Sequence, residues 1–363
     1  MANLKRNNSL EYLNLAFELA KINLGSTKEN PSVGCVVEKN GSIISSGFTS
    51  INGRPHAESN ALKKNINFKN ANIYITLEPC SHYGKTPPCT NIIKKKGIKK
   101  VFYSINDFDK RSKNKSQKVL LRKKISISKL NLKNKGLKFY ESYYRFKTNK
   151  PPIVDAKIAV SNDYFTKNIK NRWITNESSR RLTHLLRSKY NVIVSTSKTI
   201  NEDNSILDCR INGLTDKSPD LIIFDRNLQI KKNLSIFKTK VKRKIFIFTT
   251  KKNMKKIRWL KKNKIKVFLK KNMNTFSDYK ILFKSFTNLG YSRVLVESGL
   301  TFMNFLINNK LINEIYIFKT RFDLNKYGLN SSSNKLIKKI KLKNKLKVNL
   351  GDDAVYKEKI SNV

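Results

Sequence analysis

The spacing of apolar residues changes from a helical to a strand period within the first fifty residues. Between residues 9 and 24 apolar side chains recur about every 3.6 positions, and Gly25 follows as a stop signal. The next run, NPSVGCVVEKNGSIISSGF, predicts two strands around an Asn-Gly turn at Asn40 and Gly41. A strand over residues 72–79, a helix from about residue 88 to 96 and the strand KKVFYSI follow. This alternation predicts a layered α/β domain.

The second half of the chain repeats short apolar runs between helical stretches. The strand candidates are IVDAKIAV, VIVST, LIIFD, KIFIFTT, KVFLK and RVLVESG, and NESSRRLTHLLRSK is typical of a capped helix. Such runs predict a mostly parallel sheet with both faces covered. From residue 325 the Lys-, Asn- and Ser-rich composition predicts a loose loop, and KLKVNLGDDAVYKE predicts a final strand pair. The polar run KTNKPP is the best boundary, which gives domains 1–148 and 149–363.

The charge balance raises the question of a polyanionic partner. The 363 residues include 76 Lys and Arg against 25 Asp and Glu, a net charge of +51. The basic residues are mostly scattered lysines, and the abundance of Lys, Asn and Ile indicates a genomic bias towards AT-rich codons. Because no stripe of Arg and aromatic residues is present, we expect no nucleic-acid partner. A phosphorylated substrate would still be attracted to such a surface.

Two further features of the sequence, its hydropathy and its cysteine content, bear on where in the cell the protein acts. No apolar run approaches the roughly 20 residues that span a membrane, so we expect no membrane partner. Four cysteines in a chain of this length do not suggest a disulfide framework. Thiolate ligands fit a reducing compartment, which predicts a cytoplasmic protein.

Candidate chemistry is concentrated in two runs, PHAES at residues 55–59 and TLEPCSHYGKTPPC at residues 76–89. They supply His56, Cys80 and Cys89, a set that can hold one tetrahedral Zn²⁺ with one position open to water. Glu58 follows His56 by two residues and would stand beside the metal as the catalytic proton carrier. The order H-x-E and then P-C is the known signature of zinc nucleobase deaminases. The plainer interpretation is a helix start with buried cysteines.

These runs, together with NPSVGCVV, resemble the bifunctional deaminase/reductase family of riboflavin biosynthesis. The eight residues between Cys80 and Cys89 are specific to that resemblance. The resemblance implies a cytidine-deaminase-like three-layer domain followed by a dihydrofolate-reductase-like α/β domain. It also implies a phosphorylated pyrimidine substrate, Zn²⁺ and NADPH as cofactors, and a homo-oligomer.

The resemblance extends to individual residues of the first domain. Those that match deaminase substrate contacts are Asn30, His82, Lys85 and Asp107. The run DFDKRSKNK stands where the family has Asp-Pro-Asn-Pro, so both prolines are replaced and Asp109 has no clear counterpart role.

The match to the reductase half is looser. Residues that match cofactor contacts are Ala159, Trp173, Thr199, Asp203 and Gly299. Residues that match substrate contacts are Ser161, Asn171, Arg187, Leu207, Arg210 and Glu297. Arg187 and Arg210 are suited to bind a phosphate through bidentate forks. The turn at Glu297 to Gly299 opens a helix whose N-terminus can cradle a phosphate.

Some positions depart from the family pattern. Tyr164 replaces a Gly, Asn204 and Ser205 replace an Asp-Pro pair, and Asn171 and Arg226 replace small polar residues. Tyr164 is expected to crowd a tight turn, because bulky residues rarely adopt the backbone angles that Gly allows.

The resulting hypothesis is a two-step enzyme. Zinc-dependent hydrolysis would convert 2,5-diamino-6-(5-phosphoribosylamino)pyrimidin-4(3H)-one to 5-amino-6-(5-phosphoribosylamino)uracil. NADPH would then reduce the ribosyl group to give 5-amino-6-(5-phosphoribitylamino)uracil, a step for which the sequence indicates no obvious acid–base residue. Two alternatives stay open, a nucleic-acid base deaminase and a deaminase whose reductase half is only structural.

Overall fold

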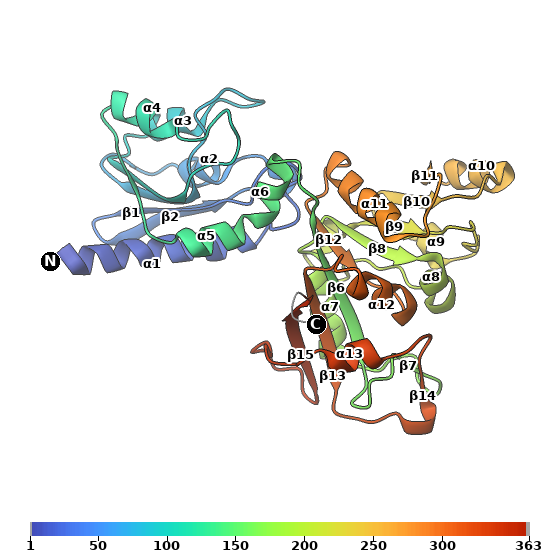
Figure 1. Ribbon diagram of the computed structural model, residues 1–363. Helices are drawn as coiled ribbons and strands as arrows, with labels where there is room; N and C mark the ends of the chain where they lie inside the picture. Colours follow the sequence, from blue (N-terminus) through green and yellow to red (C-terminus); the bar gives the residue numbers. More distant parts are fainter. Residues whose placement is uncertain (1, 361–363) are drawn as a thin grey trace. The chain divides into compact units, whose positions relative to one another are not determined.

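The computed structural model describes residues 2–360 and divides the chain into two compact units, residues 1–150 and 151–363 (Figure 1). The division falls two residues after the expected one, and residues 1 and 361–363 of the expected domains lie outside the described residues. Each unit contains its own large sheet. Within residues 2–360, every helix is too short or too polar to cross a membrane.

The N-terminal unit is built on a five-stranded sheet in the order β2-β1-β3-β4-β5. Its strands are β1 (Gly34–Lys39), β2 (Ser42–Phe48), β3 (Asn72–Leu77), β4 (Lys100–Ile105) and β5 (Ser126–Lys129). The pairs that involve β1 are antiparallel and the others are parallel. Asn40 and Gly41 both have positive φ, which confirms the predicted turn between β1 and β2.

Helices cover both faces of this sheet and make three layers. They are α1 (Ala2–Lys21), α2 (Ala57–Leu62), α3 (Cys89–Lys95), α4 (Ser116–Arg122), α5 (Lys133–Phe139) and α6 (Glu141–Lys147), with a 3₁₀ turn η1 (Ile51–Gly53). Helices α1 and α5 lie on one face, and α2, α3 and α4 lie on the other (Figure 1). Two glycines allow this close packing: a Cβ at Gly34 would lie 1.8 Å from the Ala16 carbonyl oxygen, and one at Gly47 would lie 2.5 Å from the Ala57 carbonyl oxygen.

The C-terminal unit is built on an eight-stranded sheet in the order β11-β10-β9-β8-β12-β6-β13-β15. Its strands are β6 (Ile153–Val160), β8 (Val192–Thr196), β9 (Asp220–Phe224), β10 (Ile245–Thr249), β11 (Lys266–Leu269), β12 (Arg293–Val296), β13 (Glu314–Thr320) and β15 (Asp353–Lys359). Every neighbouring pair is parallel except β13 and β15, which confirms the mostly parallel sheet. The predicted final strand pair is wrong, because the segment forms one strand, β15, and a single bridge between Lys345 and Tyr356.

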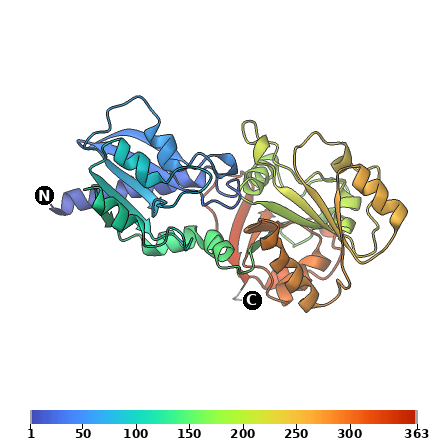
Figure 2. The ribbon, with the colours of Figure 1, turned by 90° about the horizontal axis from the view of Figure 1, so that it is seen from above.

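Helices cover both faces of this second sheet as well (Figure 2). They are α7 (Glu177–Arg187), α8 (Ser197–Asp203), α9 (Ser235–Lys238), α10 (Met254–Lys262), α11 (Phe276–Asn288), α12 (Leu300–Asn308) and α13 (Lys335–Lys339), with 3₁₀ turns η2 (Thr215–Lys217) and η3 (Asn325–Tyr327). One buried cluster joins α11, α12 and α13 to the sheet, and a separate cluster joins α8, α9 and α10 to it. The alternating apolar runs of the sequence therefore form a strand layer between two helix layers.

The predicted loose loop after residue 325 is a folded segment. Strand β14 (Gly328–Leu329) pairs with β7 (Lys167–Asn168), and Ile337 of α13 is buried. The amide groups of Asn330 and Asn334 donate hydrogen bonds to the Tyr164 carbonyl, at 3.2 and 3.0 Å. Asn side chains thus supply specific contacts that a composition argument cannot detect.

These contacts hold Tyr164 in the backbone conformation that was expected to be difficult for it. Its φ is 67°, in the left-handed region where Gly is easier to place. The ring packs against the main core of the unit, and the Lys319 ammonium lies 4.5 Å from its centroid. The turn is therefore retained with a tyrosine in it.

Candidate active sites

The three predicted metal ligands converge in the N-terminal unit. His56 is the N-cap of α2, Cys80 follows β3, and Cys89 is the first residue of α3. Their ligand atoms all lie within 4.8 Å of one another. The His56 Nδ1 lies 3.3 Å from the Cys89 sulfur and 3.7 Å from the Cys80 sulfur. The fold therefore brings together a tripod of one imidazole and two thiols.

This tripod has the dimensions of a tetrahedral zinc site. Zn–S bonds of about 2.3 Å and Zn–N bonds of about 2.05 Å at tetrahedral angles place nitrogen and sulfur about 3.6 Å apart. The two observed Nδ1–sulfur distances, 3.3 and 3.7 Å, lie on either side of that separation. His56 Nδ1 is the ring nitrogen that faces both sulfurs, so it is the ligand atom that this arrangement offers. The donor set fits Zn²⁺ with one position left for water.

The hydrogen bond between the two thiols shifts their pKa values in opposite directions. A hydrogen bond with Cys89, and then the neighbouring His56, lower the pKa of Cys80 to about 4. The same hydrogen bond and burial raise the pKa of Cys89 well above its usual range. The thiolate is the form of cysteine that binds a metal ion, and a bound cation would favour this form for both residues.

Glu58 is placed to move protons at this site. It lies in the first turn of α2, two residues after His56, and is buried with 3% of its surface exposed. Burial, and then the nearby Cys80 sulfur, raise the pKa of Glu58. Its carboxyl group is therefore beside the tripod without being part of the ligand set.

The predicted substrate residues of this unit lie on separate segments. Asn30 donates from Nδ2 to the Gly53 carbonyl at 3.2 Å, in the segment just before His56. His82 and Lys85 lie on the loop between the two cysteines, where His82 is half-buried and Lys85 is exposed. Asp107 is buried after β4, accepts from the Tyr143 hydroxyl at 3.0 Å, and has its pKa raised to about 6 by burial.

The Asp109 carboxylate is paired with two basic side chains, which the sequence did not indicate. Its carboxylate accepts from the Arg111 side chain at 2.7 and 3.0 Å and from Lys147 at 3.0 Å. The hydrogen bond from Arg111 lowers the pKa of Asp109 below its usual range. Asp109 therefore fixes the replaced DFDKRSKNK loop instead of standing free for a ligand.

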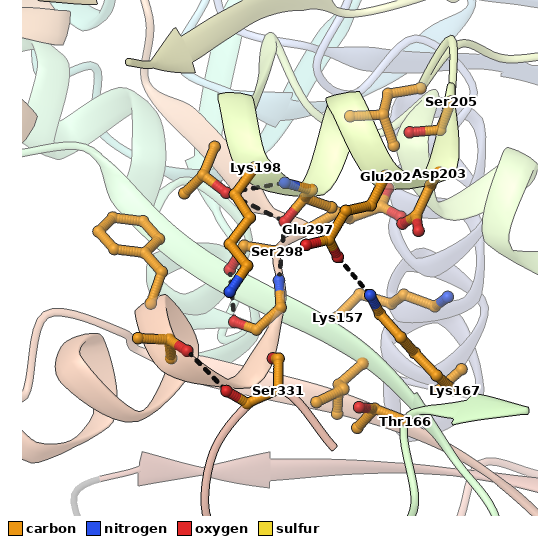
Figure 3. A pocket seen from close by; sticks show the side chains of 18 of the residues that line it. Lys157, Thr166, Lys167, Lys198, Glu202, Asp203, Ser205, Glu297, Ser298 and Ser331 are labelled. Atoms are coloured by element: carbon orange, nitrogen blue, oxygen red, sulfur yellow. Dashed lines mark hydrogen bonds and ion pairs between the residues drawn. The ribbon is translucent and has the colours of Figure 1, made fainter. Parts of the chain in front are cut away.

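A pocket of about 950 Å³ lies in the C-terminal unit (Figure 3). It lies at the carboxyl ends of β6, β8, β9 and β12, where ligand sites of open α/β sheets form. The structure places these predicted residues in its wall: Ala159, Trp173, Arg187, Thr199, Asp203, Leu207, Glu297 and Gly299. Residues far apart in the sequence thus meet around one space.

Three predicted substrate residues do not line this pocket. Ser161 is fully buried and its Oγ lies 2.5 Å from the Asp163 carboxylate, which fixes the Tyr164 turn. Asn171 is exposed outside the pocket wall. Arg210 is exposed and its guanidinium lies 3.2 Å from Asp208. Their substrate roles stay predictions that this arrangement does not support.

Arg187 is in the pocket wall, but its guanidinium group already makes hydrogen bonds within the protein. Nε lies 2.6 Å from Glu297 Oε1, and Nη2 lies 2.9 Å from Oε2. Nη1 donates to the Asp208 carbonyl at 3.0 Å. Burial alone would raise the pKa of Glu297, but Arg187 outweighs it and the pKa is lowered. The ion pair of Arg187 and Glu297 is part of the pocket wall. In this arrangement Arg187 cannot also bind a phosphate with two hydrogen bonds.

Lys157 is a pocket residue that the sequence analysis missed. Its ammonium lies 5.3 Å from the Phe318 ring centroid, and within residues 2–360 it makes no ion pair. Burial lowers the pKa of Lys157, and the Glu297 carboxylate partly offsets this shift. A single lysine inside the apolar run IVDAKIAV was the signal that could have identified it.

The turn before α12 joins two of the predicted cofactor residues. Gly299 is the N-cap of this nine-residue helix, as expected. Its N–H donates to the Thr199 Oγ1 at 3.0 Å. Lys167 pairs with Glu202, which is on the same helix α8 as Thr199 (Figure 3). The pocket lining therefore contains both a helix N-terminus and a paired lysine and glutamate.

Comparisons with known proteins agree with the division of the chain into two units, residues 1–150 and 151–363. A model of the cytidine and deoxycytidylate deaminase zinc-binding region matches residues 6–105, and a model of the RibD C-terminal domain matches residues 152–320. Riboflavin biosynthesis protein RibD of Aquifex aeolicus is 30% identical over 353 residues, which cover 95% of this chain and 96% of that protein. RibD of Actinobacillus pleuropneumoniae is 29% identical and covers 85% of this chain and 82% of its own length.

Solved structures show the same architecture across both units. A diaminohydroxyphosphoribosylaminopyrimidine deaminase/5-amino-6-(5-phosphoribosylamino)uracil reductase from Thermotoga maritima superposes with a TM-score of 0.80 at 25% identity. That match covers 98% of this chain and 99% of the other. RibD of Acinetobacter baumannii has a TM-score of 0.80 at 23% identity and covers 97% of this chain and 99% of its own, which shows the shared fold.

The fold and the two sites define a two-domain α/β enzyme with a deaminase-type metal tripod and a separate reductase pocket. The chain belongs to the RibD family and is a bifunctional deaminase and reductase of riboflavin biosynthesis. This family assignment favours the two-step enzyme over a nucleic-acid deaminase and over a second half that is only structural.

Proposed function

We propose that the N-terminal unit holds one Zn²⁺ and deaminates 2,5-diamino-6-(5-phosphoribosylamino)pyrimidin-4(3H)-one. The observation that carries this proposal is the tripod of His56, Cys80 and Cys89 with the buried Glu58 beside it. When bound, zinc supplies a water molecule that can lose a proton near pH 7. Glu58 would accept that proton while the resulting hydroxide adds to the ring carbon that bears the amino group, and would then donate it to that amino group, which leaves as ammonia.

The segments around the tripod supply substrate contacts in this proposal. Asn30 and His82 would offer hydrogen-bonding groups to the pyrimidine, and the buried Asp107 would be a further polar contact. Lys85, exposed on the loop between the cysteines, is a point charge for the phosphate.

For the C-terminal unit we propose NADPH as cofactor and 5-amino-6-(5-phosphoribosylamino)uracil as substrate. The pocket wall has six cationic side chains against three carboxylates, and two of the carboxylates are paired within it. The surplus of positive charge supports ligands that carry phosphate groups. The volume of about 950 Å³ also exceeds what a single nucleotide needs.

Lys157 is the proposed proton donor of the reduction. NADPH, when bound, would supply a hydride to the first ribosyl carbon, whose bond to the ring oxygen would break. The ring oxygen then needs a proton, which the Lys157 ammonium can donate from its apolar surroundings. The fixed pair of Arg187 and Glu297 would orient the ribosyl group by hydrogen bonds.

One coupled assay tests both halves. Purified zinc-loaded protein is given the diamino substrate, and ammonia release and the absorbance of NADPH at 340 nm are followed together. We expect ammonia first and NADPH oxidation after it. Ammonia without NADPH oxidation would contradict the reductase assignment, and NADPH oxidation with only the deaminated compound would contradict the deaminase assignment.

A homo-oligomeric state, a cytoplasmic location and the absence of a nucleic-acid ligand are also part of the proposal. Sedimentation of the purified chain tests the oligomeric state.

Chromatography on an RNA or DNA column tests the absence of a nucleic-acid ligand. A nucleic-acid binder with net charge +51 should be retained at physiological salt and elute only as the salt concentration rises, so such retention would contradict the proposal.

A further inference from the structure

Ser112 makes the closest side-chain contact that His82 has in the structure. It lies between β4 and α4, in the run where the family pattern has prolines, and its side chain is fully buried. The Ser112 Oγ lies 2.7 Å from His82 Nδ1. It also accepts a hydrogen bond from the Ser81 N–H at 3.4 Å. A hydroxyl from a distant segment thus holds two consecutive residues of the loop between the metal-binding cysteines.

These contacts fix the direction of the hydrogen bond. The Ser81 N–H can only donate, so Ser112 Oγ accepts from it. The hydroxyl hydrogen of Ser112 then needs an acceptor, because buried polar groups are paired. Within residues 2–360 the acceptor in reach is His82 Nδ1. Nδ1 is therefore the unprotonated nitrogen of the ring, and the proton of the neutral imidazole is on Nε2.

The other edge of the ring lies near Gly84 and the Arg54 side chain. A Cβ on Gly84 would lie 3.8 Å from His82 Nε2 and 3.6 Å from Arg54 Nη2. The Arg54 side chain is held there by a hydrogen bond from Nη1 to the Thr86 hydroxyl. Two N–H groups from different segments therefore lie close to Gly84, and both can donate to an oxygen acceptor.

We propose that Ser112 is a positioning residue of the deaminase, which fixes His82 with its proton on Nε2 so that His82 and Arg54 together bind an oxygen acceptor of the pyrimidine substrate. The inference rests on the proposed deamination for its substrate. The Ser112–His82 pairing itself does not depend on that function. Ser112 acts only through His82 and is not placed against the reacting atoms.

The ring proton can be observed directly because the chain has three histidines. In the full-length zinc-loaded protein labelled with ¹⁵N-histidine, three rings give three sets of nitrogen signals, and His82→Gln assigns one of them. We expect a protonated Nε2 and a bare Nδ1 for His82. Ser112→Ala should shift the ring towards a mixture of tautomers, and Ser112→Thr should restore it. A wild-type His82 with its proton on Nδ1 would overturn the proposal even if no variant folds.

Steady-state kinetics provide the second readout. Loss of one orienting hydrogen bond should raise KM for the diamino substrate about tenfold in Ser112→Ala. We expect kcat and zinc content to stay at the wild-type value, and Arg54→Met to raise KM in the same way. A reduced kcat at unchanged KM would contradict a positioning role.

Ser116→Ala is the matched control. Ser116 is equally buried a few residues further along, but its hydroxyl donates to Glu78 at 2.7 Å and not to His82. This variant should leave the His82 tautomer and KM unchanged, and a tautomer shift in it would overturn the specific role of Ser112. A wild type with the expected tautomer but no ammonia release would instead contradict the proposed deamination alone.

Discussion

Glu58 is a buried carboxyl group beside three metal ligands, and its proposed task is to carry one proton. Glu58→Gln keeps the shape of the side chain but cannot accept the proton. We expect it to retain zinc and to lose ammonia release by at least a factor of about 100, the usual contribution of general acid–base catalysis. Zinc content by atomic absorption and the reductase rate of the same preparation are the controls. Ammonia release at the wild-type rate would rule out this role.

Asp107 makes stability depend on pH, because burial raises its pKa to about 6 in the folded chain. The unfolded chain has a pKa near 3.9, so folding favours the protonated carboxyl group. This stabilisation is complete below the unfolded pKa and is lost as pH rises through about 6. Between pH 5 and 8 the free energy of unfolding should fall by roughly 1.5 kcal/mol more in the wild type than in Asp107→Asn.

Urea unfolding of both proteins at the two pH values tests this. The side-chain amide oxygen introduced by Asp107→Asn could still accept from the Tyr143 hydroxyl and the Asp109 N–H, so hydrogen bonding is matched. Loss of zinc at acid pH affects both proteins and cancels in the difference. Parallel pH profiles would show that Asp107 is not titrating in this range.

At the residue scale, sequence reasoning found the groups that belong to short motifs. His56, Glu58, Cys80 and Cys89 are spaced within runs of a few residues, and the structure brings them together. It did not find Ser112 or Lys157, because their partners lie 30 or more residues away and only the fold places them together. For the same reason it assigned a phosphate to Arg187, whose fork is taken by Glu297, 110 residues further on.

Helix α2 carries Glu58 and is positioned by a glycine on the strand beneath it. A Cβ at Gly47 would lie 2.5 Å from both the Ala57 carbonyl oxygen and the Ala61 nitrogen. These are backbone atoms, so Gly47→Ala must displace the helix as a whole. We expect a loss of about 2 kcal/mol in stability from overpacking. The same displacement should lower zinc retention, because His56 is the N-cap of α2.

Chemical unfolding and zinc content measure both effects. Ser46→Ala, at the preceding residue, is half-buried and adds no volume, so it should leave both unchanged. Full zinc retention in a destabilised Gly47→Ala would show that the tripod does not depend on the position of α2.

Strand β15 stabilises the start of helix α7 through one carboxylate. Asp353 Oδ2 accepts from the Asn176 N–H at 2.8 Å and from the Ser179 hydroxyl at 2.6 Å, and Asp353 is buried. Its charge also faces the positive end of the helix. Asp353→Ala should cost about 3 kcal/mol, because it removes hydrogen bonds to a charged group and leaves the donors unpaired.

The neighbouring Asp352 is a natural control. Its exposed carboxylate pairs with Arg321 at 2.8 Å, and its side chain is 45% exposed. Surface ion pairs contribute little, so Asp352→Ala should change the free energy of unfolding by less than about 1 kcal/mol. Equal effects of the two substitutions would contradict the helix-capping role of Asp353.

At the element scale, periodicity predicted strands that are buried and continuous. The runs before Cys80 and around residues 153–160, 192–196 and 245–249 are strands whose residues are mostly buried. The segment after residue 325 was wrongly expected to be loose, because its order depends on Asn330 and Asn334 bonding to Tyr164. Hydrogen bonds between segments of low hydrophobicity leave no periodic signal in the sequence.

The two units have separate sheets and separate buried clusters. The N-terminal core runs from Leu13 to Tyr143, and the C-terminal clusters begin at Val154. All three metal ligands lie in the first unit and every residue that lines the reductase pocket lies in the second. The molecule therefore has two chemical centres whose supporting contacts do not overlap.

Metal removal should separate the two activities in the intact chain, because the candidate metal ligands found within residues 2–360 all lie in one unit. The proposed zinc would bind the folded tripod far better than the unfolded chain, so its removal should lower the stability of the N-terminal unit. After treatment with a chelator and dialysis, we expect ammonia release to disappear and NADPH oxidation with the deaminated substrate to continue at the untreated rate. In calorimetry only the transition of the N-terminal unit should move to lower temperature, and added Zn²⁺ should restore both that transition and ammonia release. Joint loss of the two activities would show that the reductase pocket depends on the metal centre, which the separate cores do not predict.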